Sequence, residues 1–255
     1  MLEAISNAQL LDLWEASGGG SGAPGAGGAR RSLALLRAAH PENTSEELAA
    51  LPLGECHQRL LQLRARLFGD RLESVSSCPE CGEELEMGLS VTELLASAAE
   101  TSEEATAARR EVAVDLAESA LRLRGRSPTL ADLMAIGSED PERRLLEHCV
   151  LEARRHGAPI PAGALEPDEV TELGRRLTEA DPWLELWLDL DCGGCGHRFR
   201  QLLDPGAYLA TELEIAAAQL MRQIHRLARA YGWSEAEILA LSSRRRHAYL
   251  EQLEL

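Results

Sequence analysis

The chain has 255 residues, an apolar fraction of 45% and a formal net charge of −16. The apolar fraction is ample for a buried core, and the charge argues against a general nucleic-acid binder and favours a soluble, cytoplasmic protein with basic or neutral partners. No run of eighteen apolar residues occurs, so we expect no membrane span. Every basic residue is an arginine, which excludes a lysine nucleophile, a Schiff base and a phosphate-loop lysine.

The N-terminal part is predicted to be a short helix on a flexible tether. Within residues 1–16, Ile5, Leu10, Leu13 and Trp14 recur at helical intervals. Residues 17–29 are more than half glycine, which predicts a linker. Two interpretations of the tethered helix stay open: a loosely docked piece of the same fold, or a motif that inserts into a groove of a partner.

Residues 30–70 are predicted to be a helical segment. Thr44 and Glu47 have the spacing of a capping box, which places a helix start there. A second helix follows Pro52 and ends near Phe68. Cys56 lies in this helix without a partner at metal-ligand spacing, so we expect a buried thiol there.

Two short cysteine knuckles follow, at residues 78–82 (Cys-Pro-Glu-Cys-Gly) and 192–196 (Cys-Gly-Gly-Cys-Gly). Alternating apolar residues flank both, which predicts a strand on each side. The apolar positions that we assign to these strands are Leu72, Val75, Leu85, Met87, Leu89, Leu184, Leu186, Leu188, Leu190, Phe199 and Leu202. Strand, knuckle, strand, repeated twice, predicts a zinc-ribbon module formed by residues 71–90 and 183–204.

The four knuckle cysteines, Cys78, Cys81, Cys192 and Cys195, are predicted to bind one structural Zn²⁺. Two residues between cysteines, with a glycine after the second, let both thiolates of a tight turn point at one tetrahedral ion. Four thiolates fill the coordination shell and leave no position for a substrate or an activated water.

Other interpretations of the knuckles are weaker but open. A redox dithiol needs only one such pair, and disulfides would need an oxidising compartment, although no apolar signal segment opens the chain. An iron–sulfur cluster also suits four thiolates. His197 could replace one cysteine as a ligand, but we expect it on the outgoing strand.

Residues 91–182 are predicted to be a mainly helical insertion between the knuckles. After an acidic, alanine-rich segment near residues 100–108, Leu121 and Leu123 indicate one short strand. Helices are expected from 130 to 136, from Pro141 through Ala153 with Gly157 beyond the end, and from 167 to 180. The second of these would bury Cys149 in its apolar face.

Residues 205–255 are predicted to be a C-terminal helical segment. Apolar residues step by three and four along a long helix that ends at Gly232, where glycine suits a left-handed cap. Ser234 with Glu237 forms a capping box for a short helix. A last helix carries the basic run Arg244-Arg245-Arg246.

No catalytic group is apparent in the sequence, so we predict that the protein is not an enzyme and takes no small-molecule substrate. The acidic pairs lie at helix starts, where the macrodipole favours negative charge. The histidines are scattered and lack a partner at metal-ligand spacing.

The C-terminal residues carry a family resemblance. Residues 224–235 (Ile-His-Arg-Leu-Ala-Arg-Ala-Tyr-Gly-Trp-Ser-Glu), continuing through 238–242 and 244–251, resemble the end of the T4-like phage baseplate protein family. Residues 51–82, which include the first knuckle, resemble the zinc-bearing bacterial members. The likeness covers most of residues 45–255; the C-terminal signature is its specific part, and the glycine-rich leader departs from the family.

The resemblance implies a function in contractile-tailed phages or related contractile injection systems, as a baseplate hub component or a hub-assembly factor. Its partners would be other baseplate or hub proteins, and the chain would be cytoplasmic or incorporated in a phage-like particle. The expected partner-binding residues are Tyr231, Trp233, Arg244, Arg245, Arg246 and Tyr249. The alternative is a zinc-ribbon regulator that binds DNA through the arginine-rich last helix.

Overall fold

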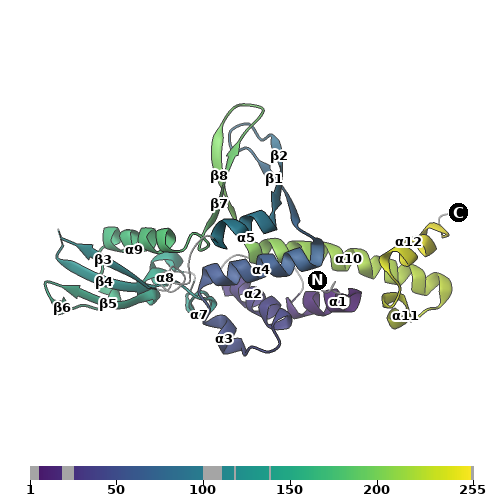
Figure 1. Ribbon diagram of the computed structural model, residues 1–255, viewed down its shortest axis with the longest axis horizontal. Helices are drawn as coiled ribbons and strands as arrows, with labels where there is room; N and C mark the ends of the chain where they lie inside the picture. Colours follow the sequence, from purple (N-terminus) through teal and green to yellow (C-terminus); the bar gives the residue numbers. More distant parts are fainter. Residues whose placement is uncertain (1–5, 19–25, 100–110, 118, 138, 254–255) are drawn as a thin grey trace.

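The computed structural model describes residues 6–18, 26–99, 111–117, 119–137 and 139–253. It is an elongated molecule in which a helical body carries a sheet module at one end, a group of C-terminal helices at the other and two β-hairpins that project from its middle (Figure 1). The sequence predicts an α+β, mainly helical fold, and the structure confirms this as a mixture of helices with small antiparallel sheets. Among the described residues, no helix is long and apolar enough to cross a membrane.

The helical body buries one apolar core. It consists of α1 (Asn7–Ala16), α2 (Ala26–Ala39), α3 (Ser45–Ala49), α4 (Leu53–Phe68), α7 (Leu130–Ala135) and the first part of α10 (Pro205–Tyr231). Thr44 caps α3 in the predicted capping box, and Cys56 is fully buried on α4. The core side chains are Leu13, Ala29, Leu35, Leu36, Leu48, Cys56, Leu60, Leu63, Leu130, Leu209 and Leu213.

The N-terminal helix is docked on this body. It packs against α10 and α2, with Leu11 and Leu13 buried and the Trp14 indole nitrogen donating to Glu214 at 2.7 Å. Ile5 lies outside the described residues. The next helix, α2, begins at Ala26 and buries Ala29, so the last residues of the predicted linker are helical.

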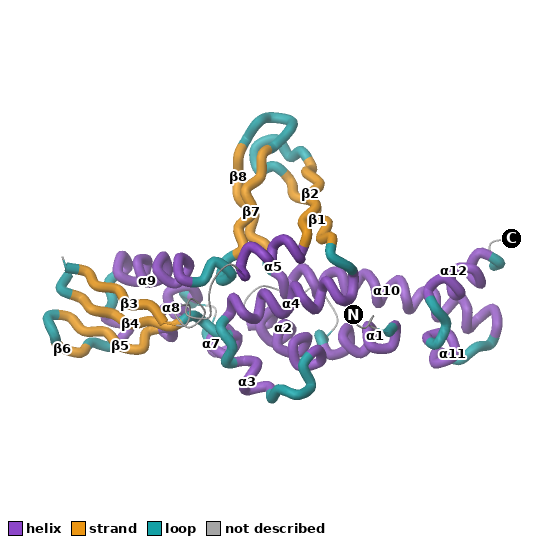
Figure 2. The backbone as a smooth tube through the Cα atoms, viewed as in Figure 1, coloured by secondary structure: helices purple, strands orange, loops and turns teal. Residues whose placement is uncertain are grey.

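The two hairpins are β1 (Arg71–Ser77) with β2 (Glu84–Ser90), and β7 (Leu186–Asp191) with β8 (Arg198–Leu203). We call them together the hairpin arch. They form two separate two-stranded sheets, and α5 (Val91–Ala99) follows the first. Figure 2 shows two arms that rise from the body and end in adjacent loops. Their bases pack on one apolar cluster, formed by Leu61, Leu72, Val91, Trp183 and Leu203.

The alternation along these strands is mostly as predicted. Val75 and Leu202 are exceptions, being 59% and 45% exposed, because they fall on the outward positions of their strands. The inward positions there are held by Ser76 and Leu203. Leu184 precedes β7.

The insertion differs most from the prediction, because it contains a four-stranded antiparallel sheet. Its strands, in the order β3-β4-β5-β6, are Glu111–Leu116, Leu121–Arg126, Val150–Arg155 and Ala158–Pro159. The helices are α8 (Pro141–Cys149) and α9 (Pro167–Ala180), with the 3₁₀ turn η1 (Ala162–Ala164) between them in sequence. The predicted acidic segment at 100–108 lies outside the described residues. We call residues 111–180 without α7 the sheet module.

The helix predicted from Pro141 through Ala153 is wrong in its last four residues. Helix α8 ends at Cys149, and residues 150–155 instead pair with β4, Ala153 opposite Leu123. The main-chain hydrogen bonds of that pairing and burial of Ala153 override the local helical pattern. Cys149 is buried as expected, in a core that the sheet shares with α9.

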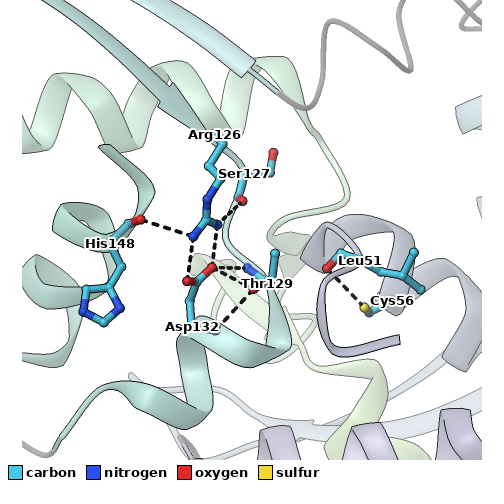
Figure 3. A network of polar contacts seen from close by, with 7 residues as sticks. All are labelled: Leu51, Cys56, Arg126, Ser127, Thr129, Asp132 and His148. Carbon is cyan, nitrogen blue, oxygen red and sulfur yellow. Dashed lines mark hydrogen bonds and ion pairs between the residues drawn. The ribbon is translucent and has the colours of Figure 1, made fainter. Parts of the chain in front are cut away.

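A polar network joins the sheet module to the helical body. The Asp132 carboxylate accepts from both terminal nitrogens of Arg126, at 2.6 and 2.7 Å, and from the main chain and hydroxyl of Thr129 (Figure 3). Arg126 belongs to β4 and Asp132 to α7. Since Leu53 N also donates to Pro128 O at 2.8 Å, this corner fixes the sheet module on the body.

The chain ends in α11 (Glu235–Leu239) and α12 (Ser243–Glu251), which fold back on the second half of α10. Gly232 caps α10 with a φ of 71°, and Ser234 with Glu237 forms the predicted capping box. The apolar residues between these helices are Leu11, Ala217, Leu220, Ile224, Leu227, Ile238 and Leu250.

Candidate metal centre

Each cysteine knuckle closes one arm of the hairpin arch. The β1–β2 ladder ends at the pair Ser77 and Glu84, and the β7–β8 ladder ends at Asp191 and Arg198. Each knuckle therefore replaces the tight turn of its hairpin, and the strands hold it at the tip of the arm.

The two knuckles have the same backbone geometry. In the first, Cys78 N donates to Glu83 O at 2.8 Å and Gly82 N donates to Cys78 O at 2.9 Å. In the second, the matching bonds join Cys192 with His197 O at 2.9 Å and Gly196 N with Cys192 O at 2.8 Å. The glycine after each second cysteine has a φ near the left-handed region, 74° and 73°, where other residues are strained.

The structure brings the four predicted cysteines together across 117 residues of chain. Their sulfurs lie within 4.8 Å of one another. Cys78 Sγ is 3.7 Å from Cys195 Sγ, and Cys81 Sγ is 3.6 Å from Cys192 Sγ. Four sulfurs at about 2.3 Å around a tetrahedral ion stand about 3.8 Å apart, so the group can hold one metal ion.

The same distances decide between a metal site and disulfides. A disulfide needs sulfurs about 2.05 Å apart, and all four cysteines are free thiols. Cys78 and Cys192 are buried, while Cys81 and Cys195 are exposed. Each knuckle thus contributes one buried and one exposed cysteine to the group.

His197 lies next to the second knuckle and contacts it through its main chain. Its carbonyl accepts the hydrogen bond from Cys192, and its ring stacks on Phe199 with centroids 6.1 Å apart. Within the described part of the chain, the potential ligand group consists of the four cysteines without this histidine. We predicted His197 on the outgoing strand, but it lies one residue before that strand, β8, begins at Arg198.

The thiols are not electrostatically equivalent. Hydrogen bonding from the backbone at Cys195 lowers the pKa of Cys192 to about 7. At Cys81 the backbone at Glu83 lowers the pKa, but hydrogen bonding with the other cysteines and burial outweigh it and raise the pKa to about 12. Such a group releases protons when a metal binds, because the ligands of a thiolate site are deprotonated.

Few other contacts join the two arms. Ser76 Oγ donates to Gln201 Oε1 at 3.3 Å, and a Cβ added at Gly194 would lie 3.5 Å from the Glu83 side chain. These contacts are weak beside four metal–sulfur bonds. The arms are held at the base by the apolar cluster and at the tip by the cysteines.

The sequence did not identify the groups that hold the base of the arch. The Tyr208 hydroxyl donates to Glu73 O, and Arg64, almost fully buried, forms a two-pronged pair with Glu212 at 2.7 and 2.8 Å. His57 Nδ1 lies 2.8 Å from Trp183 O. None of these residues is part of a local motif, because each partner comes from a distant element.

The predicted partner-binding residues lie on the C-terminal helices in two different environments. Tyr231, Trp233 and Tyr249 form one aromatic cluster, with centroid distances of 4.7 to 5.7 Å, and remain partly accessible. Arg244 and Arg245 are exposed on α12. Arg246 instead is buried and bonded within the protein, so it is not part of that exposed surface.

In comparisons with known proteins, no family model, no curated protein and no solved structure matches this chain. The metal centre therefore rests on the spacing of the cysteines and on their geometry.

Proposed function

We propose that the protein is a non-enzymatic baseplate component, or baseplate hub-assembly factor, of a phage-like contractile tail or contractile injection system, and that Zn²⁺ at the four cysteines has a structural role. The observation that carries the structural role is the cluster of four cysteine sulfurs at the tip of the hairpin arch, which lie within 4.8 Å of one another. Four thiolates leave no position on the ion for a substrate.

The metal would replace a core that the arch lacks. A two-stranded hairpin is marginally stable in water, and the two arms share only a few polar contacts above their base. Binding one ion at both knuckles couples the tips of the arms, so that binding free energy becomes folding free energy.

The assembly role is supported by the family resemblance of residues 224–251 and by surfaces suited to protein partners. Trp187 and Leu202 are cross-strand neighbours on the outward face of the second arm, and they are 40% and 45% exposed. The Arg200 guanidinium lies over the Trp187 ring, 4.8 Å from its centroid. Exposed aromatic and arginine side chains are enriched in protein interfaces.

The metal is tested by elemental analysis of the purified full chain. We expect about one zinc per chain, without acid-labile sulfide. Iron together with sulfide, or no metal after purification without chelators, would overturn the zinc assignment.

The assembly role is tested in the cell that encodes the chain, with a tagged copy at its own locus. We expect sheath, tube or spike proteins to copurify with it, and the Arg244→Ala, Arg245→Ala double variant to lose them while it keeps its fold and zinc. Arg246 stays unchanged in this variant because its substitution would disturb packing. Salt-sensitive, sequence-selective duplex binding that the double variant loses would instead favour the DNA-binding regulator.

A further inference from the structure

Helix α1 covers a surface of α2, α10 and α12, which we call its groove, and this surface has an unusual buried charge at one end. The Arg246 side chain is 4% exposed, and its guanidinium meets only neutral acceptors among the described residues. These acceptors are Gln223 Oε1 at 3.1 Å, Leu241 O at 2.8 Å, Asn7 Oδ1 at 3.1 Å and Ser243 Oγ at 3.2 Å.

A comparison with Arg64 shows what is missing. Arg64 is equally buried, but its Nε and Nη2 both donate to the Glu212 carboxylate, which raises its pKa. For Arg246, whose hydrogen-bond acceptors among the described residues are all neutral, burial lowers the pKa. A buried guanidinium is more strongly stabilised by a carboxylate than by amides and carbonyls, because a charge-assisted pair offsets its desolvation.

The missing carboxylate has a natural position on the helix that fills the groove. Asn7 is the first residue of α1, and the first turn of α1 has no acidic residue. A carboxylate at this place would also be stabilised by the helix macrodipole. Helix α1 therefore fits the groove, but a helix with a carboxylate in its first turn would bind there more tightly.

The remaining contacts of α1 define a simple recognition pattern. Leu10, Leu11 and Trp14 follow Asn7 at the third, fourth and seventh positions, which share one face of a helix. Leu10 packs against both the body core and the C-terminal cluster, Leu11 is buried in the latter, and Trp14 donates to Glu214.

We propose that this groove is a docking site for an amphipathic helix of a partner protein, one with Asp or Glu in its first turn and apolar residues three, four and seven positions later. The partner carboxylate pairs with Arg246, and the partner helix displaces α1. The proposal is independent of the metal centre and of the identity of the assembly.

The test uses the full chain and a synthetic helix. The chain carries Leu11→Ala and Trp14→Ala, which weaken α1 so that it competes less well for its own groove. The probes are labelled peptides of residues 6–18, one with Asn7 and one with Asp at this position. Binding is measured by fluorescence anisotropy.

We expect the Asp peptide to bind roughly five- to tenfold more tightly than the Asn peptide, as a charge-assisted hydrogen bond exceeds a neutral one. Arg246→Gln should bring the ratio close to one, and Arg244→Gln, an exposed neighbour, should leave it unchanged. Equal affinities with Arg246 present, a ratio that does not depend on Arg246, or no binding of either peptide would overturn the proposal.

A second measurement covers the case in which the weakened chain does not fold. Asn7→Asp in the otherwise unchanged chain should raise the midpoint of thermal unfolding, and Arg246→Gln should remove most of this gain. The helix macrodipole alone would raise both backgrounds equally, so an equal gain in both would contradict the pairing.

Discussion

The hairpin arch and the sheet module both consist of short antiparallel strands, but they are stabilised in different ways. The sheet module has its own apolar core, in which Leu173 and Leu177 of α9 cover Leu121 and Leu123 of β4. The arch has apolar packing at its base and four cysteines at its tip. A sheet covered by helices is stable through burial, whereas two uncovered hairpins need a cross-link.

The largest effect that separates the two regions is expected from Cys81→Ser. The variant should lose its metal, and amide hydrogens of β2 and β8 should lose protection from exchange, because the tips of the arms are no longer joined. The sheet module should keep its protection. Cys149→Ala, which removes a buried thiol outside the knuckles, is the control and should keep full zinc content; retention of zinc by Cys81→Ser would contradict the four-cysteine centre.

The converse change is Leu173→Ala in the core of the sheet module. Removing this fully buried side chain should cost about 2–5 kcal/mol in the free energy of unfolding, since the transferred apolar surface is lost and a cavity remains. Zinc content should not change. Leu151→Ala, in the same module but 46% exposed, should cost about 0.5 kcal/mol or less in the same urea titration.

A smaller effect is expected at the corner that fixes the sheet module to the body. Burial alone would raise the pKa of Asp132, but hydrogen bonds from Arg126 and Thr129 lower it below its ordinary value. Asp132→Asn should therefore destabilise the fold by about 1–3 kcal/mol, because Arg126 loses its charged partner. The exposed pair Asp115 and Arg122, 3.3 Å apart, provides the control: Asp115→Asn should cost at most about 1 kcal/mol.

The smallest effect is a pH dependence at the base of the arch. Burial lowers the pKa of His57 from 6.5, so the unfolded chain binds more protons than the folded one below that pH. Stability from the neutral ring is complete above pH 6.5 and is lost as the pH falls from there towards the folded pKa. Urea titrations from pH 7.5 to 5 should show this slope, and His57→Asn, which keeps a donor for Trp183 O, should reduce it; an unchanged slope would exclude His57 as its source.

Local signals in the sequence were sufficient for elements whose ends carry their own chemistry. Thr44 with Glu47, Ser234 with Glu237 and the glycine at 232 each fix a helix end through contacts within a few residues. The knuckles could be predicted from the sequence equally well, because two cysteines and a following glycine form a turn through hydrogen bonds among neighbouring residues. Zinc as the metal and the baseplate as the site of action stay predictions.

Of the four strands of the insertion, the sequence predicted only the one at Leu121 and Leu123, which is β4; the others were missed because their pairing partners are distant or give no alternating pattern. Residues 150–155 continue the apolar pattern of α8. They form a strand because their main chain pairs with β4. Val75 and Leu202 were predicted as apolar positions of the strands, and the register of each hairpin places them on the outward face. A shift of one residue in strand register moves every side chain to the opposite face of the hairpin, and composition alone does not specify the register.

The sequence by itself determined the capped helix ends at Thr44, Ser234 and Gly232, the two knuckles and the identity of four candidate ligands, because these depend on groups separated by a few bonds. Only the tertiary structure decided that sulfurs 117 residues apart meet, that α1 docks on the body and that Arg246 is buried. Such facts depend on packing between distant elements, where burial and pairing of charge outweigh the local preferences of the chain.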